Sequence, residues 1–299
     1  MYKFNVPKEK QVRVIVDTDA KNEADDQYAI VHALLTPKFN IKGIVASHFG
    51  TRRTRTSMEE SYEECVKLLD LMEPTGKVDV LRGAKEAIVS EREYEFSEGA
   101  RRIVDEALSD DPSKLFVVFL GPITNLACAY LHNPEIAGKL TAIWIGGAPY
   151  PEGGSEFNLS NDIEAARIIM KSDIELWQVP TNAFSRIVTS LAELQDKVYP
   201  CGKVGKYLFE QMVEFNTAIV GHYEGWPHGE SWTLGDSAVI GLMLDPHDYA
   251  WTMREAPLID EDMKYHFDGN GRQIRVYHDI DSRFILEDMF AKLKINYGS

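Results

Sequence analysis

Five carboxylates lie within ten residues near the start of the chain, at Asp17, Asp19, Glu23, Asp25 and Asp26. Like charges at this spacing repel one another unless a cation lies among them. Carboxylate oxygens are ligands that Ca²⁺ and Mg²⁺ prefer, and they suit zinc less well. The alternative is a solvated loop in which Asp25 or Asp26 stabilises a helix N-terminus. We favour a divalent metal site, although the segment lacks the Gly and distal Glu of an EF-hand loop.

A second polar pair, Glu156 and Asn158, flanks Phe157 in the segment SEFNLSNDIEAA. If this segment is extended, the two side chains point to the same side. A carboxylate and an amide placed in that way can hold the vicinal hydroxyls of a sugar. The alternative is an ordinary polar loop before a helix that begins near Asp162.

Other candidates carry weaker signals. Asp236 opens an apolar helical run and by itself is typical of a helix N-cap. His48 follows a strand-like run, so it could face a site at the strand end or belong to an ordinary loop. His222 and His228 lie in GHYEGWPHGESW, which fits either a packed loop or a mobile wall over a flat heterocycle.

The elements that must position these residues alternate between strand and helix patterns. The apolar run 115–121 suits a strand buried on both faces of a parallel sheet. We therefore predict an α/β fold, one domain over residues 1–299, with a mainly parallel central sheet flanked by helices. Expected strands cover 12–17, 42–47, 78–83, 115–121, 142–147 and 174–180, and a last strand and helix follow residue 255. Ligands bind at the carboxyl ends of such strands, where the acidic segment lies.

The composition of the chain disfavours several classes of partner and function. The 32 Lys and Arg against 47 Asp and Glu leave a formal charge of −15, which disfavours nucleic acid as a partner. Cys65, Cys128 and Cys201 are too scattered for a disulfide framework or a zinc site.

No membrane partner is expected, since no apolar run approaches about 20 residues. The first ten residues lack the apolar core of a signal peptide, so we expect a cytoplasmic protein. The motifs of serine hydrolases, zincins and nucleotide-phosphate enzymes are missing.

Four motifs in order resemble the inosine–uridine preferring nucleoside hydrolases, a calcium-dependent N-ribohydrolase family. They are the acidic D-x-D with its paired Asp, LGPITNLA from Leu120, EFNLSNDIEAA and GDSAVIGLMLDP. The similarity runs from about residue 12 to about residue 246. It implies a nucleoside hydrolase-like fold with a Rossmann-like core and hydrolysis of a nucleoside, a small molecule, to free base and ribose. It also implies a homodimer or homotetramer.

The resemblance also implies residue roles at the matching positions. Ca²⁺ would be held by Asp19, Asp26 and Asp236 and by the backbone carbonyl of Leu120. Asp25 would be the general base that deprotonates the attacking water. Glu156 and Asn158 would bind ribose hydroxyls.

The sequence departs from the family pattern in four places. One is the loop APYPEGGS before Glu156, which lacks the usual ribose-contacting Asn. The turn between the D-x-D and the paired Asp is longer by about two residues, which brings Asn22 and Glu23 into the pocket region. The Asn that usually follows the second strand is missing, and we expect Asn22 or His48 to contact the sugar in its place. Gly235 stands where many members have a His that assists the departing base. His48, His222, Tyr223 and His228 are then the candidate proton donors, and Trp226 or Trp232 could stack on the base.

Two other functions remain open. Gly235 is compatible with a nucleoside- or sugar-binding relative that has weak or no turnover. The opening VIVDTD also superficially resembles aspartyl-nucleophile phosphatases, with Asp17 as nucleophile and Asp19 as acid. The phosphatase hypothesis leaves Asp25, Asp26 and the later motifs unexplained.

Overall fold

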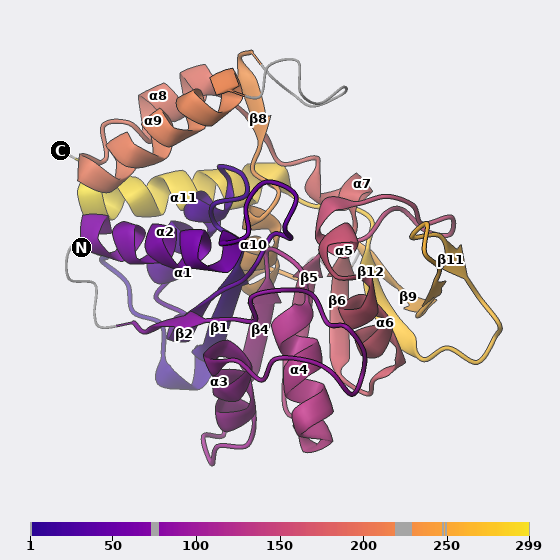
Figure 1. The fold of residues 1–299 in the computed structure, drawn as a ribbon. Coiled ribbons are helices and arrows are strands. Elements are labelled where there is room, and N and C mark those ends of the chain that lie inside the picture. The colour runs from indigo at the N-terminus through magenta and orange to yellow at the C-terminus, as the bar shows by residue number, and fades with distance from the viewer. Residues whose placement is uncertain (1, 73–77, 219–228, 247, 249, 299) are drawn as a thin grey trace.

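The computed structural model describes residues 2–72, 78–218, 229–246, 248 and 250–298. Its centre is an eight-stranded sheet with the order β3-β2-β1-β4-β5-β6-β12-β9 (Figure 1). All neighbours in it are parallel except β9, which pairs antiparallel with β12. The strands are β1 (Val12–Thr18), β2 (Phe39–Ala46), β3 (Val80–Arg82), β4 (Leu115–Phe119), β5 (Thr141–Ile145), β6 (Glu175–Val179), β9 (Trp251–Glu255) and β12 (Gln273–Tyr277).

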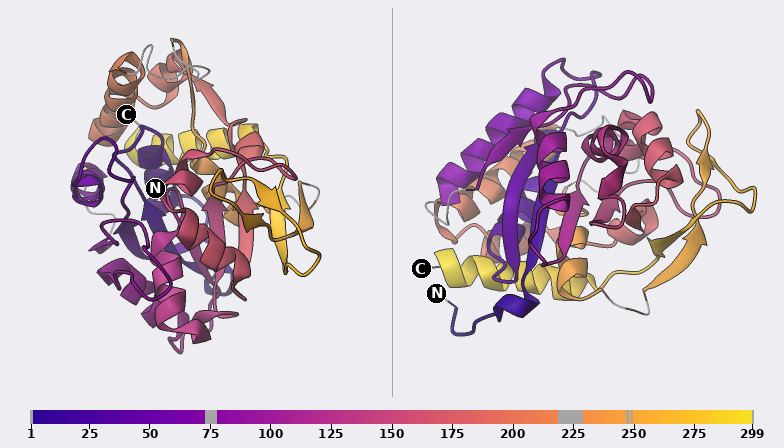
Figure 2. Two further views of the ribbon diagram at one scale, coloured as in Figure 1. Left: turned by 45° about the vertical axis from the view of Figure 1, so that its right-hand side comes forward. Right: turned by 90° about the horizontal axis from the view of Figure 1, so that it is seen from below.

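Helices cover both faces of this sheet (Figure 2). Alternate side chains of a strand point to opposite faces, and in β1 Val14 and Val16 belong to one apolar core while Ile15 belongs to the other. The first core packs under α1 (Asp26–Leu34), α2 (Ser57–Met72), α8 (Leu191–Lys197), α9 (Gly202–Ala218), α10 (Ser237–Leu244) and α11 (Ser282–Tyr297). The second packs under α3 (Glu98–Ala107), α4 (Thr124–His132) and α6 (Ile163–Lys171).

Smaller elements complete the described chain. Two short antiparallel pairs, β7 with β8 and β10 with β11, lie outside the main sheet. These elements are η1 (Lys8–Lys10), η2 (Pro134–Ile136), α5 (Phe157–Asn161), α7 (Thr181–Phe184), β7 (Val188–Ser190), β8 (Ser231–Thr233), β10 (Leu258–Ile259) and β11 (Tyr265–His266).

The strand order reverses at β1. The chain passes from β1 outward to β2 and β3, then returns to place β4 on the other side of β1. The loops that leave β1 and β4 therefore diverge and open a crevice at the carboxyl ends of the strands, where open α/β sheets bind ligands. Asp19 follows β1 and Leu120 follows β4, so the topology brings both to this crevice.

The predicted α/β fold with a mainly parallel sheet flanked by helices is confirmed, while the domain limits at residues 1 and 299 stay a prediction. One condition set in the sequence analysis is not met. The segment around Asn158 is the short helix α5, not an extended segment, because Glu156 caps it by accepting the backbone N–H groups of Asn158 and Leu159. Among the described residues, no helix is both long and apolar enough to span a membrane.

Candidate active site

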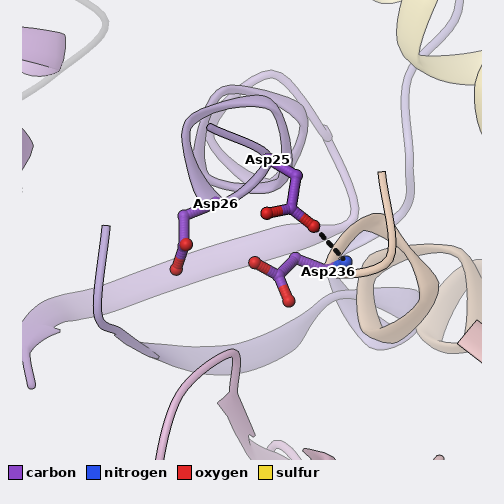
Figure 3. Close-up of side chains that lie close together, drawn as sticks. All are labelled: Asp25, Asp26 and Asp236. Atoms are coloured by element: carbon purple, nitrogen blue, oxygen red, sulfur yellow. Dashed lines mark hydrogen bonds between the residues drawn. The ribbon is translucent and has the colours of Figure 1, made fainter. Parts of the chain in front are cut away.

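Buried carboxylates meet in a cavity of about 440 Å³ at the point where the strand order reverses. Asp25 and Asp26 enter it from the start of α1, and Asp236 enters from the start of α10 on the opposite wall (Figure 3). One carboxylate oxygen from each of the three lies within 4.8 Å of the others. Asp19 also lines the cavity. The crevice thus contains carboxylates that lie as far apart in the sequence as Asp19 and Asp236.

Helix capping does not explain why Asp25 and Asp236 stand at the starts of their helices. Asp25 and Asp236 occupy the N-cap positions of α1 and α10, but neither side chain accepts a capping hydrogen bond. Instead, Oδ2 of Asp25 accepts the backbone N–H of Asp236 at 3.3 Å. Oδ1 of Asp26 accepts the Thr18 hydroxyl at 2.5 Å. The carboxylates are therefore oriented toward one another across the crevice.

Asp19 is held close against the loop after β4. It is 2 % exposed, and its Oδ2 has no hydrogen-bond partner among the residues that the structure describes. A Cβ atom on Gly121 would lie 2.7 Å from Cγ of Asp19, so the glycine is what allows this approach. A buried carboxylate oxygen without a partner is costly unless a ligand satisfies it.

The electrostatics of the cavity favour a cation. Burial raises the pKa of Asp25 to about 7, with repulsion from Asp26 adding to it. Burial likewise raises the pKa of Asp26 to about 6, against the hydrogen bond from Thr18. Burial and then the neighbouring acids raise the pKa values of Asp19 and Asp236 well above the usual range. A bound divalent cation would remove both the repulsion and the unpaired oxygen of Asp19. This buried set of oxygen ligands fits a hard metal ion.

Leu120, Glu156 and Asn158 form one hydrogen-bonded unit in the cavity wall. The amide nitrogen of Asn158 donates to the carbonyl oxygens of Leu120 at 2.7 Å and Ile145 at 2.9 Å. Because both amide hydrogens are used, Oδ1 of Asn158 is the atom left for a ligand. Glu156 accepts three backbone N–H groups, from Gly147, Asn158 and Leu159. Leu120, Glu156 and Asn158 all line the cavity.

The longer turn after Asp19 reaches the cavity, as expected. Asn22 and Glu23 both line it. Asn22 is 4 % exposed, and its Oδ1 has no hydrogen-bond partner in the described part of the chain. Burial and then repulsion from Asp25 raise the pKa of Glu23, whereas Arg53 opposes the shift. Asp17, by contrast, does not line the cavity, because Oδ2 of its buried side chain accepts the Asn125 amide at 2.9 Å.

The wall around Gly235 explains why no larger side chain stands there. A Cβ atom at Gly235 would lie 2.8 Å from Cδ2 of Phe184, so the aromatic ring fills that space. Phe184 and Trp232 line the cavity here, together with Thr181, Ser185 and Thr233. Four sequence candidates for this wall, His222, Tyr223, Trp226 and His228, lie outside the described residues.

His48 is not brought to the cavity. It is fully buried and does not line the pocket. Its Nδ1 accepts the backbone N–H of Gly50, so its Nε2 carries the hydrogen that points to Thr124 Oγ1 at 2.9 Å. The Thr124 hydroxyl in turn donates to Asp162. Both ring nitrogens are used within the protein, and we do not retain His48 as a sugar ligand or proton donor.

His48 should instead govern stability in acid. Burial lowers its pKa to about 4, below the value near 6.5 of an unfolded histidine. Between these two pH values only the unfolded state binds the proton. The contribution of His48 to the free energy of unfolding is therefore complete above about pH 6.5 and is lost as the pH falls toward 4. The expected loss is roughly 3 kcal/mol. Denaturant unfolding of wild type and His48→Asn across this range checks it: the wild-type free energy should fall more steeply, and parallel curves would exclude the role.

Several cavity residues were missed from the sequence. Arg52, Phe157 and Ser160 line the side next to α5, and Phe184 lines the side next to α7. The three arginines of TRRTR at 51–55 were the available signal, since they follow a predicted strand end in a strongly acidic chain.

Comparisons with known proteins agree with this geometry. Residues 14–285 match the family described as inosine-uridine preferring nucleoside hydrolase. Uridine nucleosidase 1 of Arabidopsis thaliana is 27% identical over 270 residues, covering 82% of this chain and 75% of its own length. The non-specific ribonucleoside hydrolase RihC of Salmonella enteritidis is 24% identical over 258 residues, or 79% of each chain.

A solved structure shows the same fold. The plant nucleoside hydrolase PpNRh1 superposes with a TM-score of 0.77 at 20% identity, covering 94% of this chain and 98% of its own. The family match spans most of the chain and both walls of the acidic cavity. The chain therefore belongs to the inosine-uridine preferring nucleoside hydrolase family, the N-ribohydrolases that cleave nucleosides to free base and ribose.

Proposed function

We propose that this nucleoside hydrolase uses Ca²⁺, held by Asp19, Asp26 and Asp236 with the Leu120 carbonyl as a further ligand. The observation that carries the proposal is the buried cluster of Asp25, Asp26 and Asp236. Asp19 lines the same cavity, and its Oδ2 has no hydrogen-bond partner among the described residues. When bound, the ion would orient water and sugar hydroxyls and lower the pKa of that water. Ca²⁺ suits the site because it takes six to eight oxygen ligands in flexible geometry.

Asp25 is proposed as the general base. Its Oδ2 is fixed by the backbone N–H of Asp236, which aims the carboxylate at the centre of the crevice. From there it would take a proton from the water that attacks C1′ of the sugar. The remaining carboxylates would stabilise the positive charge that develops on the sugar as the N-glycosidic bond breaks.

A second assignment has structural support. Asp25 lies within the same 4.8 Å cluster as Asp26 and Asp236, so it is also placed to bind the metal. Asp19 has the free buried oxygen that a base requires. The roles of Asp19 and Asp25 would then be exchanged, and the paired variants in the Discussion separate the two assignments.

The sugar is proposed to lie against Asn158, Glu156 and Asn22. The free Oδ1 atoms of Asn158 and Asn22 can each accept a hydroxyl hydrogen, and Oε1 of Glu156 accepts only one backbone N–H. The base would then point toward Phe184 and Trp232, whose rings offer apolar contact to a flat heterocycle.

The test is a panel of purine and pyrimidine nucleosides, with p-nitrophenyl riboside as a substrate whose leaving group needs no acid. Free base and reducing sugar are measured together, and the proposal expects both in equal amounts. Ligand binding without base release from any substrate would favour a non-catalytic relative. Release of inorganic phosphate from general phosphoesters would favour the phosphatase alternative.

We also propose a homodimer or homotetramer, on the basis of the family resemblance, and a cytoplasmic location. Light scattering of the purified chain at several concentrations measures the assembly directly. A monomer at all concentrations would contradict it.

A further inference from the structure

The lengthened turn between Asp19 and Asp25 brings an additional carboxylate, that of Glu23, to the cavity. The Glu23 side chain is partly buried, and its carboxylate forms no hydrogen bond or ion pair with another described residue. Neither the metal site nor the proton transfer proposed above uses it. Glu23 is therefore a charged group in the cavity wall that is available to a ligand.

Glu23 lies on the side of the cavity that carries the aromatic wall. Helix α9 contacts both features. Nε2 of Gln211 donates to the carbonyl oxygen of Ala24 at 2.8 Å, and the ring of Phe215 packs edge-on against Trp232 with 5.6 Å between ring centroids. Residues four apart lie on one face of a helix. The turn that carries Glu23 is thus held beside the wall against which the base is proposed to lie.

The cavity offers a ligand negative charge and hydrogen-bond acceptors. Its two buried polar atoms that lack a partner among the described residues are both oxygens, Oδ2 of Asp19 and Oδ1 of Asn22. Six acids line it, and one divalent ion balances only two of their charges. Arg52, the one Lys or Arg in the described lining, is exposed and is held at α5 by the Ser160 hydroxyl at 3.1 Å. The cavity therefore favours a ligand that brings positive charge.

The wall around Gly235 is suited to a base that leaves without a proton. Among the described residues that line the cavity there is no His, Lys, Tyr or Cys. The Phe184 ring lies where a side chain at position 235 would stand, 2.8 Å from its Cβ. A neutral base gains from a proton as it departs, whereas a cationic base becomes neutral when it takes the electron pair of the C1′–N bond. The faces of Phe184 and Trp232 would also attract such a cation.

We propose that the enzyme accepts, besides neutral nucleosides, nucleosides whose base is a cationic heterocycle, and that Glu23 determines this specificity. The proposal rests on the proposed function, which supplies the sugar site and Asp25. Water adds to C1′, and Asp25 takes the proton of that water. The C1′–N bond breaks, and its electron pair returns to the ring, which leaves as a neutral base. The products are free base and ribose, and the positive charge of the substrate is released as a proton.

The experiment compares N-ribosylnicotinamide, a cationic nucleoside, with p-nitrophenyl riboside in the Ca²⁺-loaded protein. Both leaving groups depart without an acid, so the comparison isolates the charge. Glu23→Gln should lower kcat/KM for the cationic nucleoside by roughly 10-fold, the order expected when one unit charge is removed from a partly buried wall. The change for p-nitrophenyl riboside should be much smaller. Glu23→Asp keeps the charge and should retain most of the activity on the cation.

Glu63→Gln is the matched control. Glu63 is exposed and does not line the cavity, and its replacement changes the net charge of the chain by the same amount. Its kinetics should resemble those of wild type with both substrates.

An enzyme that cleaves inosine or uridine but releases no base from N-ribosylnicotinamide would overturn the proposal, as would an equal loss on both substrates in Glu23→Gln. A loss confined to inosine and uridine would make Glu23 a proton donor instead. Calorimetric titration with 1-methylnicotinamide, a cation, and neutral nicotinamide separates these results from failure of the proposed reaction. If no substrate releases base, tighter binding of the cation that disappears in Glu23→Gln still supports its recognition by Glu23. Equal binding of the two compounds refutes it.

Discussion

Asp25→Asn should lower base release by roughly 10²- to 10⁴-fold, the usual contribution of a general base. The substitution keeps the shape of the side chain and removes its ability to take a proton. Its contact with the Asp236 backbone N–H can persist through the Asn oxygen. Nucleoside binding and stabilisation by Ca²⁺ should therefore survive. Steady-state kinetics with thermal melts, with and without Ca²⁺, check both expectations.

Asp19→Asn is the matched partner of this variant. If Asp19 is a metal ligand, the Asp19→Asn variant should lose stabilisation by Ca²⁺ along with activity. The reason is that an amide replaces a carboxylate whose Oδ2 has no partner among the described residues. If Asp25→Asn is the variant that loses Ca²⁺ stabilisation while Asp19→Asn keeps it, the two roles are exchanged. Near-normal turnover in Asp25→Asn would remove that residue from proton transfer.

Chelation should lower the melting temperature, and added Ca²⁺ should restore it. A ligand that binds only the native state stabilises it by about 2.7 kcal/mol at 100 times its Kd. With an unfolding entropy of about 2.1 cal/mol/K per residue, this corresponds to about 4 °C for 299 residues. Repulsion among the uncovered carboxylates of Asp19, Asp25, Asp26 and Asp236 adds to the loss.

Asp26→Asn is the control for chelation. The Asp26 side chain lies in the cluster of three carboxylates. The melting temperature of the Asp26→Asn variant should therefore depend much less on Ca²⁺ than that of wild type. A wild-type melting curve that is indifferent to both chelator and Ca²⁺ would contradict a metal site among these residues.

The strands and the acidic crevice were predictable because their signals are local. Val14 and Val16 mark a buried strand by composition alone, and the strand-end rule then places Asp19 at the edge where ligands bind. The partnership of Asp236 with Asp25 and Asp26 is different, since more than 200 residues separate them. It was inferred from a family resemblance, not from any local pattern.

Other features depend on contacts that no local pattern reveals. His48 stands at a strand end, as predicted, but hydrogen bonds to Gly50 and Thr124 turn its ring away from the crevice. The helix α5 has only five residues and forms because Glu156 caps it. Arg52 enters the cavity through its contact with Ser160, 108 residues away.

Base release by chelated protein, followed during titration with Ca²⁺, tests most directly whether the buried carboxylates act through a metal. Fully chelated protein should release no measurable base from a nucleoside. Activity should return in proportion to Ca²⁺ and reach its maximum at one ion per chain, with free base and sugar formed in equal amounts. Undiminished base release in the presence of excess chelator would contradict calcium-dependent hydrolysis with Asp19, Asp26 and Asp236 as metal ligands.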